Sequence, residues 1–175
     1  MVQQSSGEIR WDTTAGQEEL KRRGVKPVPK PDALTQPYWD AARKHELMIQ
    51  YCPACNDYQH PPQEQCEQCQ GKPEWKKISG KGTIYSFIID HRNMVPGFTE
   101  PYVVAQIVPT EAKRQTVRLT ANIKDCDIHD VYIGMPVEVL FEDVNPTVTL
   151  PQFKPTSAAK LASRGETPPA RAGIS

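Results

Sequence analysis

Four of the chain's five cysteines lie in two CxxC pairs, and these sulfurs are the side chains best suited to chemistry. One pair is Cys52 and Cys55, the other is Cys66 and Cys69, and ten residues lie between the pairs. A CxxC turn places two thiolates on one side of a metal ion, and a second such turn completes a tetrahedron. Four thiolates leave no open position for water, so the pattern predicts one structural zinc ion that contributes to folding.

The sequence leaves other roles of the same four sulfurs open. Iron in a rubredoxin-like site uses the same four thiolates and would make the chain a small electron carrier, and spacing does not separate the two metals. A thioredoxin-like dithiol needs one CxxC beside a βαβ unit, and no such unit is evident. Disulfides are disfavoured because no signal peptide is visible, so we expect a cytoplasmic chain with reduced thiols.

Each CxxC turn needs a residue that tolerates a positive φ angle after its second cysteine. Asn56 stands there in the first pair, and Gln70 followed by Gly71 stands there in the second. The sequence therefore predicts a tight turn around each pair of sulfurs.

The composition limits the classes of partner. The chain has 175 residues, with 21 basic and 21 acidic side chains that sum to a formal charge of zero. That balance gives no general attraction to nucleic acid or to an anionic membrane. The apolar runs are far shorter than the roughly 18 residues needed to cross a bilayer. We therefore expect no membrane partner and no strong affinity for nucleic acid.

A short helix and a strand precede the first cysteine pair. Thr35 can cap a helix that has a proline in its first turn, and Tyr38, Trp39 and Ala42 recur at helical spacing. The alternating residues of segment 47–51 then indicate a strand that ends at the first cysteine.

The second half of the chain contains five runs typical of strands, rich in Val, Ile, Thr and aromatic residues. A short connection that can hold one helical turn separates the third run from the fourth. This order favours a small closed barrel of the OB type over a parallel α/β sheet. The predicted strands are 82–90, 102–108, 116–123, 136–144 and 147–153.

The predicted fold class is thus mainly β, with an N-terminal helix and a zinc ribbon followed by a five-stranded OB-fold barrel. Proline-rich and polar stretches flank this region and indicate an arm and a tail that bury little surface. The expected division is an arm over 1–31, the helix and ribbon over 32–79, the barrel over 80–153 and a tail over 154–175.

Two further groups of residues are candidates for ligand or partner binding. The lysines near the junction of ribbon and barrel could meet phosphate groups, although such clusters are more often solvated. The connection over 90–102 carries apolar and basic side chains that suggest a partner surface, unless Phe98 simply caps the barrel. The first group is Lys72, Lys76, Lys77 and Lys81, and the second is His91, Arg92, Met94, Phe98 and Tyr102.

No convincing catalytic set is present in the sequence. His91 follows Asp90, but adjacent residues of a strand point to opposite faces. Cys126 and His129 could pair a thiol with a base, yet no oxyanion hole or orienting acid accompanies them. We therefore predict no catalytic residue.

The order of these motifs resembles the acyl-CoA-associated zinc-ribbon and OB-fold family known as domain of unknown function 35. The resemblance covers about residues 32 to 153 and departs from the family at Asn56, where glycine is common. The motifs are "PYW", "CPAC", "CEQC", "GKGTIYSFIIDHR", "EPYVVAQIV" and "IGMPVEVLFED".

The resemblance implies a rubredoxin-like zinc ribbon joined to a C-terminal OB fold. It also implies a non-catalytic accessory subunit of a thiolase-fold enzyme, in a hetero-oligomer that shares a coenzyme A ester with its partner. On this reading Lys76, Lys77, Lys81 and Phe98 would face coenzyme A or the partner. The alternative is a module that binds single-stranded nucleic acid, which zero net charge and few barrel aromatics weaken.

Overall fold

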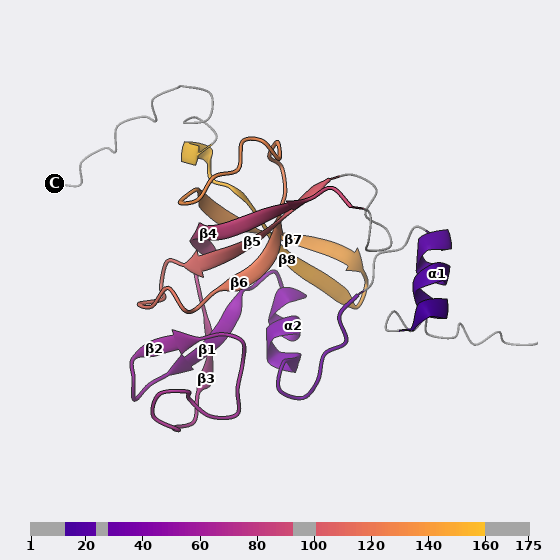
Figure 1. Ribbon diagram of the computed structural model, residues 1–175. Coiled ribbons are helices and arrows are strands. Elements are labelled where there is room, and N and C mark those ends of the chain that lie inside the picture. The colour runs from indigo at the N-terminus through magenta and orange to yellow at the C-terminus, as the bar shows by residue number, and fades with distance from the viewer. Residues whose placement is uncertain (1–12, 24–27, 93–100, 160–175) are drawn as a thin grey trace, which may run out of the picture.

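The computed structural model describes residues 13–23, 28–92 and 101–159. A helix, a small three-stranded sheet and a five-stranded barrel follow one another along most of this chain (Figure 1). No helix among these residues is both long and apolar enough to cross a membrane. The helices and strands are α1 (Thr14–Arg23), α2 (Gln36–Ala42), β1 (Met48–Cys52), β2 (Asp57–Gln59), β3 (Glu74–Lys77), β4 (Lys81–Asp90), β5 (Tyr102–Pro109), β6 (Leu119–Ile123), β7 (Pro136–Asn145) and β8 (Val148–Pro155).

Helix α1 lies within the segment predicted to be an irregular arm, so the prediction missed it. Thr13 precedes the helix, and its Oγ1 accepts a hydrogen bond from the Gly16 N–H at 3.2 Å. This is the geometry of an N-cap, which compensates one of the free N–H groups of the first turn.

Helix α2 forms where the sequence predicts a helix, but its cap differs from the prediction. The Thr35 side chain makes no capping bond to the helix. Its backbone N–H instead donates to Asp32 Oδ1 at 2.7 Å, while Thr35 Oγ1 accepts from the Asp32 N–H at 3.0 Å. Asp32 therefore holds the turn that leads into the helix. The Thr35 hydroxyl donates to Asp32 Oδ1 at 2.6 Å, and this bond, with that of the Thr35 N–H, holds the pKa of the Asp32 carboxyl below its usual value.

The ribbon is an antiparallel sheet with the order β2-β1-β3. Strand β1 is central, and its register pairs Gln50 with Gln59 of β2 and with Trp75 of β3. The two CxxC turns lie at one end of this sheet, so the strands fix the direction from which each pair of sulfurs approaches.

The barrel closes in the order β4-β5-β6-β8-β7, and the prediction of a five-stranded OB-type barrel is confirmed. Alternation produces its core: every second residue of β5 is buried, including Val103, Ala105 and Ile107. The third strand begins at Leu119, later than the predicted residue 116, because a turn with a bond from the Val117 N–H to the Arg114 C=O precedes it. Strand β8 includes Lys154 and Pro155, which the sequence analysis placed in the tail.

Ribbon and barrel share one core. Leu47, Ile49, Tyr58 and Ile78 from the ribbon side belong to the same buried cluster as the barrel residues. The chain crosses between them at Gly80, where φ is +75° and a Cβ atom would clash with Val139. Only glycine fits such a backbone conformation and close approach without strain, so this residue fixes how the ribbon meets the barrel.

Candidate metal centre

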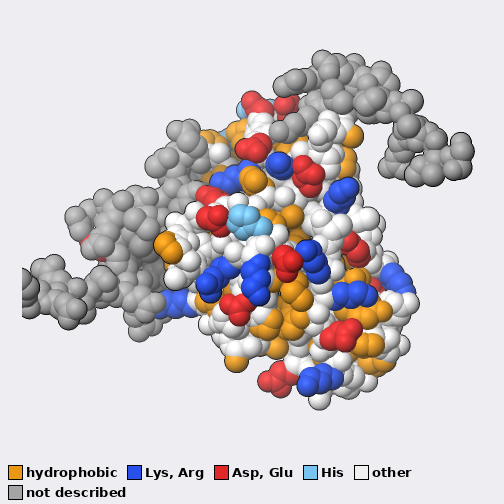
Figure 2. Space-filling model, turned by 180° about the vertical axis from the view of Figure 1, so that it is seen from behind, with side chains coloured by type: hydrophobic (Ala, Val, Ile, Leu, Met, Phe, Trp, Pro, Cys, Tyr) orange, Lys and Arg blue, Asp and Glu red, His pale blue; other side chains and the backbone are white. Residues whose placement is uncertain are grey.

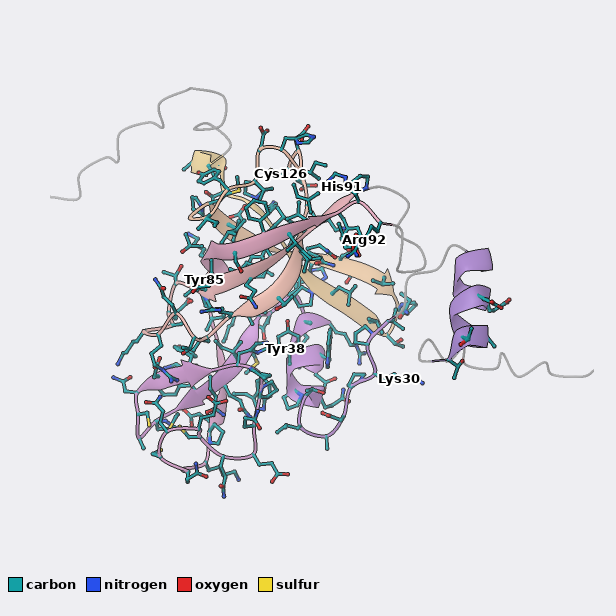
Figure 3. All side chains as sticks on the ribbon, in the orientation of Figure 1. Lys30, Tyr38, Tyr85, His91, Arg92 and Cys126 are labelled. Carbon is teal, nitrogen blue, oxygen red and sulfur yellow. The ribbon has the colours of Figure 1, made fainter. Side chains whose placement is uncertain are left out.

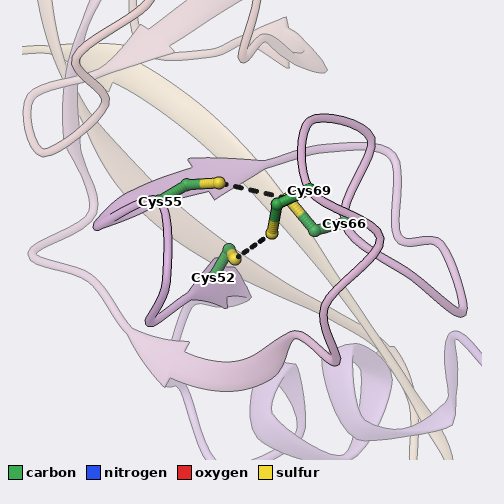
Figure 4. Close-up of side chains that lie close together, drawn as sticks. All are labelled: Cys52, Cys55, Cys66 and Cys69. Carbon is green, nitrogen blue, oxygen red and sulfur yellow. Dashed lines mark hydrogen bonds between the residues drawn. The ribbon is translucent and has the colours of Figure 1, made fainter.

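The four predicted ligands converge on one point. All four sulfurs lie within 4.8 Å of one another (Figure 4). Cys52 Sγ is 3.5 Å from Cys69 Sγ, and Cys55 Sγ is 3.8 Å from Cys66 Sγ. Tetrahedral zinc with bonds of about 2.3 Å to sulfur requires sulfur separations of about 3.8 Å. The distances fit a four-thiolate metal site and are far longer than a disulfide bond of about 2 Å.

The turns around the sulfurs have the predicted backbone conformation. Asn56 has a φ of 50° and Gln70 has a φ of 59°, so both positions expected to tolerate positive φ adopt it. The second turn is closed by bonds from the Gln70 N–H to the Cys66 C=O at 2.9 Å and from the Cys66 N–H to the Gly71 C=O at 2.8 Å. Tyr51 donates its hydroxyl hydrogen to Asn56 Oδ1 at 2.7 Å, which supports the first turn from the sheet.

Backbone donors prepare the second turn for a cation. The N–H groups of Gln68 and Cys69 stabilise a thiolate at Cys66 and lower the pKa of this thiol to about 7. At Cys55 the crowding of neighbouring sulfurs, first that of Cys69, raises the pKa to about 12. A divalent cation at the centre would remove that repulsion, because it stabilises all four thiolates at once.

A hydrogen-bonded pair of glutamines joins the ribbon strands to the connection between the cysteine pairs. The sequence analysis did not find this network. Gln50 and Gln59 are buried, and Gln59 Nε2 donates to Gln50 Oε1 at 2.7 Å. Gln50 also binds the backbone of Gln63 through both its amide oxygen and its amide nitrogen, and Gln59 Oε1 accepts from the Glu67 N–H. These bonds tie the connection between the cysteine pairs to strands β1 and β2. Strands β1 and β2 carry one of these glutamines each, so the available signal was a single glutamine in each strand beside a metal turn.

One buried ion pair attaches the first turn to the barrel. Asp57 directly follows the turn, and its Oδ2 lies 2.7 Å from Arg114 Nε in the connection between β5 and β6. Asp57 Oδ1 also accepts from the N–H groups of Tyr58 and Lys113. Burial favours the neutral acid, but the bonds from Arg114, Tyr58 and Lys113 outweigh it, and the pKa of Asp57 falls below its usual value.

The predicted lysine group does not converge on one point. Lys76 and Lys77 are adjacent on β3, and adjacent strand residues point to opposite faces. Lys76 Nζ lies 4.1 Å from the centroid of the Tyr51 ring, whereas Lys77 Nζ lies 2.8 Å from Glu46 Oε1. Lys72 and Lys81 are exposed. A role of these lysines in coenzyme A binding stays a prediction.

The predicted partner loop is described only at its two ends. Met94 and Phe98 lie outside the described residues. Asp90 accepts hydrogen bonds from the Arg92 N–H at 2.8 Å and from the Tyr102 hydroxyl at 3.3 Å, so its bonds join the two ends of the loop. His91 is exposed directly after β4, beside Arg92 (Figure 3).

Cys126 and His129 lie in a turn. The Cys126 thiol donates to the C=O of Asp127 at 3.3 Å, and Asp127 Oδ1 accepts from the His129 N–H at 2.9 Å. The half-buried cysteine side chain also packs against the barrel core. These contacts are those of a structural turn, and the interpretation that Cys126 is not a nucleophile stays a prediction.

A polar cleft of about 550 Å³ lies between α2 and the β7–β8 hairpin. Two polar pairs lie in it: His45 Nε2 lies 3.1 Å from Asp143 Oδ1, and Arg43 Nη1 lies 3.9 Å from Asp40 Oδ1. Its lining is Asp40, Arg43, Lys44, His45, Asp143, Asn145, Pro146 and Thr149. The His45 ring also stacks on Phe141 of β7, so the turn that follows α2 contacts the barrel here.

Two family profiles match the chain in the order that the structure shows. Residues 39–75 match the rubredoxin-like zinc ribbon domain of ChsH2, and residues 75–142 match the C-terminal OB-fold domain of ChsH2. The second profile begins within β3, the last strand of the ribbon, and continues into the barrel.

Individual relatives agree with this match. A DUF35 domain-containing scaffold protein of Methanothermobacter thermautotrophicus is 35% identical over 106 residues, which cover 58% of this chain and 76% of the relative. A Thermomonospora curvata protein named "Probable enoyl-CoA hydratase alpha subunit" is 35% identical over 141 residues, which cover 79% of this chain. The chain spans 43% of the length of that hydratase subunit.

A solved structure extends the similarity to three dimensions. The Ltp2-ChsH2(DUF35) aldolase contains a chain that is 34% identical, with a TM-score of 0.66 over 73% of this chain and 98% of that chain. The zinc ribbon, the barrel and their order along the chain are thus common to the sequence, the fold and the relatives. The chain belongs to the DUF35 family, in which a rubredoxin-like zinc ribbon precedes a C-terminal OB fold.

Proposed function

We propose that this chain is a non-catalytic, zinc-binding accessory subunit of a thiolase-fold enzyme complex that acts on acyl-CoA, by thiolytic C–C cleavage or its reverse. The closed four-thiolate site carries this proposal. Four sulfurs within 4.8 Å of one another fill the coordination shell of a metal ion. Such a site offers no position to a substrate, so the metal would hold surfaces in place and would not react.

The relatives support the acyl-CoA part of the proposal. One relative is named as a hydratase alpha subunit, and the solved relative is named as an aldolase together with Ltp2. The first name is that of one subunit of an enzyme and the second joins ChsH2 with Ltp2, so both support a role in an assembly with another protein. By its length and motifs the chain also resembles the zinc-finger subunit of a benzoylsuccinyl-CoA thiolase, which is one enzyme of the proposed class.

In such a complex the ribbon and the barrel would dock on the enzyme together, because they share one core and the Asp57–Arg114 pair. The accessory subunit would then help to assemble the complex and to shape the acyl-CoA pocket. Lys76, Lys77, Lys81 and Phe98 are the proposed residues on the side of coenzyme A or of the partner.

The direct test is copurification followed by reconstitution. The chain is expressed with an affinity tag in its native host, and size-exclusion chromatography measures whether a thiolase-fold protein copurifies in a complex with it. Acyl-CoA turnover is then measured with and without the chain, and we expect activity only when both are present. A thiolase-fold enzyme that is fully active alone and forms no complex would refute the proposal.

Binding of single-stranded nucleic acid is the second candidate, and one exposed aromatic residue favours it. Tyr85 on β4 is 39% exposed, and the Arg118 guanidinium carbon lies 3.6 Å from the centroid of its ring. However, the formal net charge of the chain is zero, and acidic and basic side chains lie side by side on the face that Figure 2 shows. Single-stranded nucleic acid usually binds in a basic groove that follows its phosphate backbone. A fluorescence anisotropy titration with single-stranded DNA or RNA at two salt concentrations tests it, because binding through phosphates weakens with salt.

A further inference from the structure

Strand β4 has a neighbour on both sides for only part of its length. It pairs with β5 from Gly82 to Asp90, but it pairs with β7 only at Lys81, Gly82 and Thr83. A bulge interrupts the β5 pairing between Ile84 and Ser86, and beyond it the β4–β5 and β7–β8 hairpins diverge (Figure 1). Within the described chain, no strand other than β5 pairs with segment 85–90.

This segment is therefore an edge strand. In an antiparallel pair, alternate residues direct both their N–H and their C=O groups away from the neighbouring strand. A row of such donors and acceptors is a template for one more strand. The ligand that matches it is an extended peptide segment.

The side chains of segment 85–90 do not prevent a further strand from pairing at this edge. Ile88 is 60% exposed and Tyr85 is 39% exposed, and the only charged residue of the segment is Asp90 at its end. Edge strands that avoid pairing usually carry lysine, proline or inward-pointing charges. The opposite hairpin is different, because β7 carries Glu142 and Asp143 where it diverges from β4.

Hydrogen bonds among β4, β5 and the turn before β6 fix the side chains around Tyr85. Gln106 Oε1 accepts from the Ser86 hydroxyl at 3.2 Å and from Arg118 Nη1 at 3.3 Å. Arg118 Nε also donates to the C=O of Gln115, so the guanidinium is fixed over the Tyr85 ring. Tyrosine and arginine beside an exposed apolar side chain are the residue types enriched at the centres of protein interfaces.

We propose that segment 85–90 is the place where an extended segment of the partner enzyme adds to the barrel as a strand, with Ile88 as its apolar anchor. The inference rests on the proposed function and names the surface that performs it. The partner segment would pair with the backbone of β4 and place an apolar side chain against Ile88.

The test uses the full chain and the thiolase-fold enzyme that copurifies with it. The dissociation constant is measured for the wild type, for Ile88→Lys and for Val144→Lys. Val144 is a matched control because it is also exposed and apolar but lies on the β7–β8 hairpin. We expect Ile88→Lys to weaken binding at least tenfold and Val144→Lys to change it less than twofold, with zinc content and thermal midpoint unchanged in both variants.

Hydrogen exchange then distinguishes strand addition from a contact through side chains alone. In the free chain, alternate amides of segment 85–90 should exchange quickly, and in the complex the same amides should slow at least tenfold. Equal binding of Ile88→Lys and wild type, or unprotected amides in a stable complex, would overturn this surface while leaving the proposed function intact. If the wild type binds no thiolase-fold enzyme, the proposed function fails first and this inference fails with it.

Discussion

The ribbon and the barrel are held together by different physical means. The residues buried in the ribbon sheet and its turns include Cys52, Cys66, Gln50 and Gln59, which are sulfur ligands and amides. The largest buried side chains of the barrel are apolar, among them Phe153, Ile84, Ile107, Met135 and Val137. A sheet of three short strands cannot bury enough apolar surface to fold on this basis alone. Its few buried apolar residues, such as Ile49 and Tyr58, belong to the core that it shares with the barrel. We therefore expect the ribbon to need a metal to be rigid, whereas the barrel should not.

The strongest way to break this comparison is to remove one metal ligand. Cys66→Ser should abolish metal binding, because a hydroxyl is a poor substitute for a thiolate at this site. Structural zinc contributes on the order of 10 kcal/mol to folding in small domains. Hydrogen exchange should therefore show loss of protection in β1, β2 and β3 while the barrel strands stay protected.

Cys126→Ser is the matched control, because Cys126 lies outside the metal cluster. It should retain one zinc per chain by elemental analysis. A ribbon that stays protected in Cys66→Ser would contradict the role given to the metal. An iron signal and colour in the wild type would instead support the electron carrier.

A core substitution in the barrel should have a different effect. Ile107 is fully buried, and Ile107→Ala should lower the free energy of unfolding by about 3 kcal/mol, since it removes apolar contacts and leaves a cavity. Urea unfolding measures this loss, and zinc should remain bound at one per chain. Ile88→Ala, at a side chain that is 60% exposed, should cost less than about 0.5 kcal/mol. Zinc loss in Ile107→Ala under native conditions would mean that the two regions are not stabilised separately.

The connection between the two regions can be weakened by itself. Asp57→Asn removes a buried charge from Arg114 and should cost about 2 kcal/mol of stability, because the guanidinium loses its partner in a partly buried site. Lys154→Gln removes a more exposed ion pair, in which Lys154 Nζ lies 3.6 Å from Glu138 Oε1. It should lower the free energy of unfolding by less than about 1 kcal/mol. Thermal unfolding measures both changes. Equal effects of the two substitutions would show that the junction at Asp57 is no stronger than a surface pair.

The last prediction concerns pH and the side chain of His60, which lies next to Tyr38 of α2. Burial next to Tyr38 lowers the pKa of His60 to about 4, from about 6.5 in an unfolded chain. The unfolded chain therefore binds the proton more tightly, and stability is lost as the pH falls from about 6.5 toward 4. Between pH 7 and pH 5 this amounts to at most about 2 kcal/mol.

His60→Gln should remove this dependence without changing the cysteines. The quantity to measure is the difference in unfolding free energy between wild type and variant at pH 7, 6 and 5. The difference should shift in favour of the variant as the pH falls. A constant difference would mean that His60 is protonated equally in the folded and unfolded chain.

Local patterns made much of this structure predictable. The spacing of the cysteines and the residues Asn56 and Gln70 specify the metal turns within a few positions of sequence. The alternation of apolar residues in β5 likewise predicts a strand without knowledge of its neighbours. These two local signals gave predictions that the structure confirms, whereas the local pattern gave the wrong cap at Thr35 and missed α1.

Contacts between distant parts of the chain could not be predicted in the same way. Asp57 and Arg114 are 57 positions apart, and neither residue type alone indicates a buried pair. Lys77 on β3 pairs with Glu46, which lies just before β1. The lysines that are close in the sequence therefore make separate contacts in space. The free edge of β4 depends on where β7 stops pairing, which is a property of the closed barrel and not of β4 itself.

The central claim is that the metal acts through structure and takes no part in chemistry. The most direct measurement replaces zinc by cadmium, which four thiolates also bind, and compares the acyl-CoA turnover of the reconstituted complex with that of the zinc form. The account predicts that both metals restore assembly and that turnover agrees within about twofold, while the metal-free chain restores neither. A complex that assembles fully with cadmium but loses its turnover would contradict the account, because the metal would then take part in the reaction.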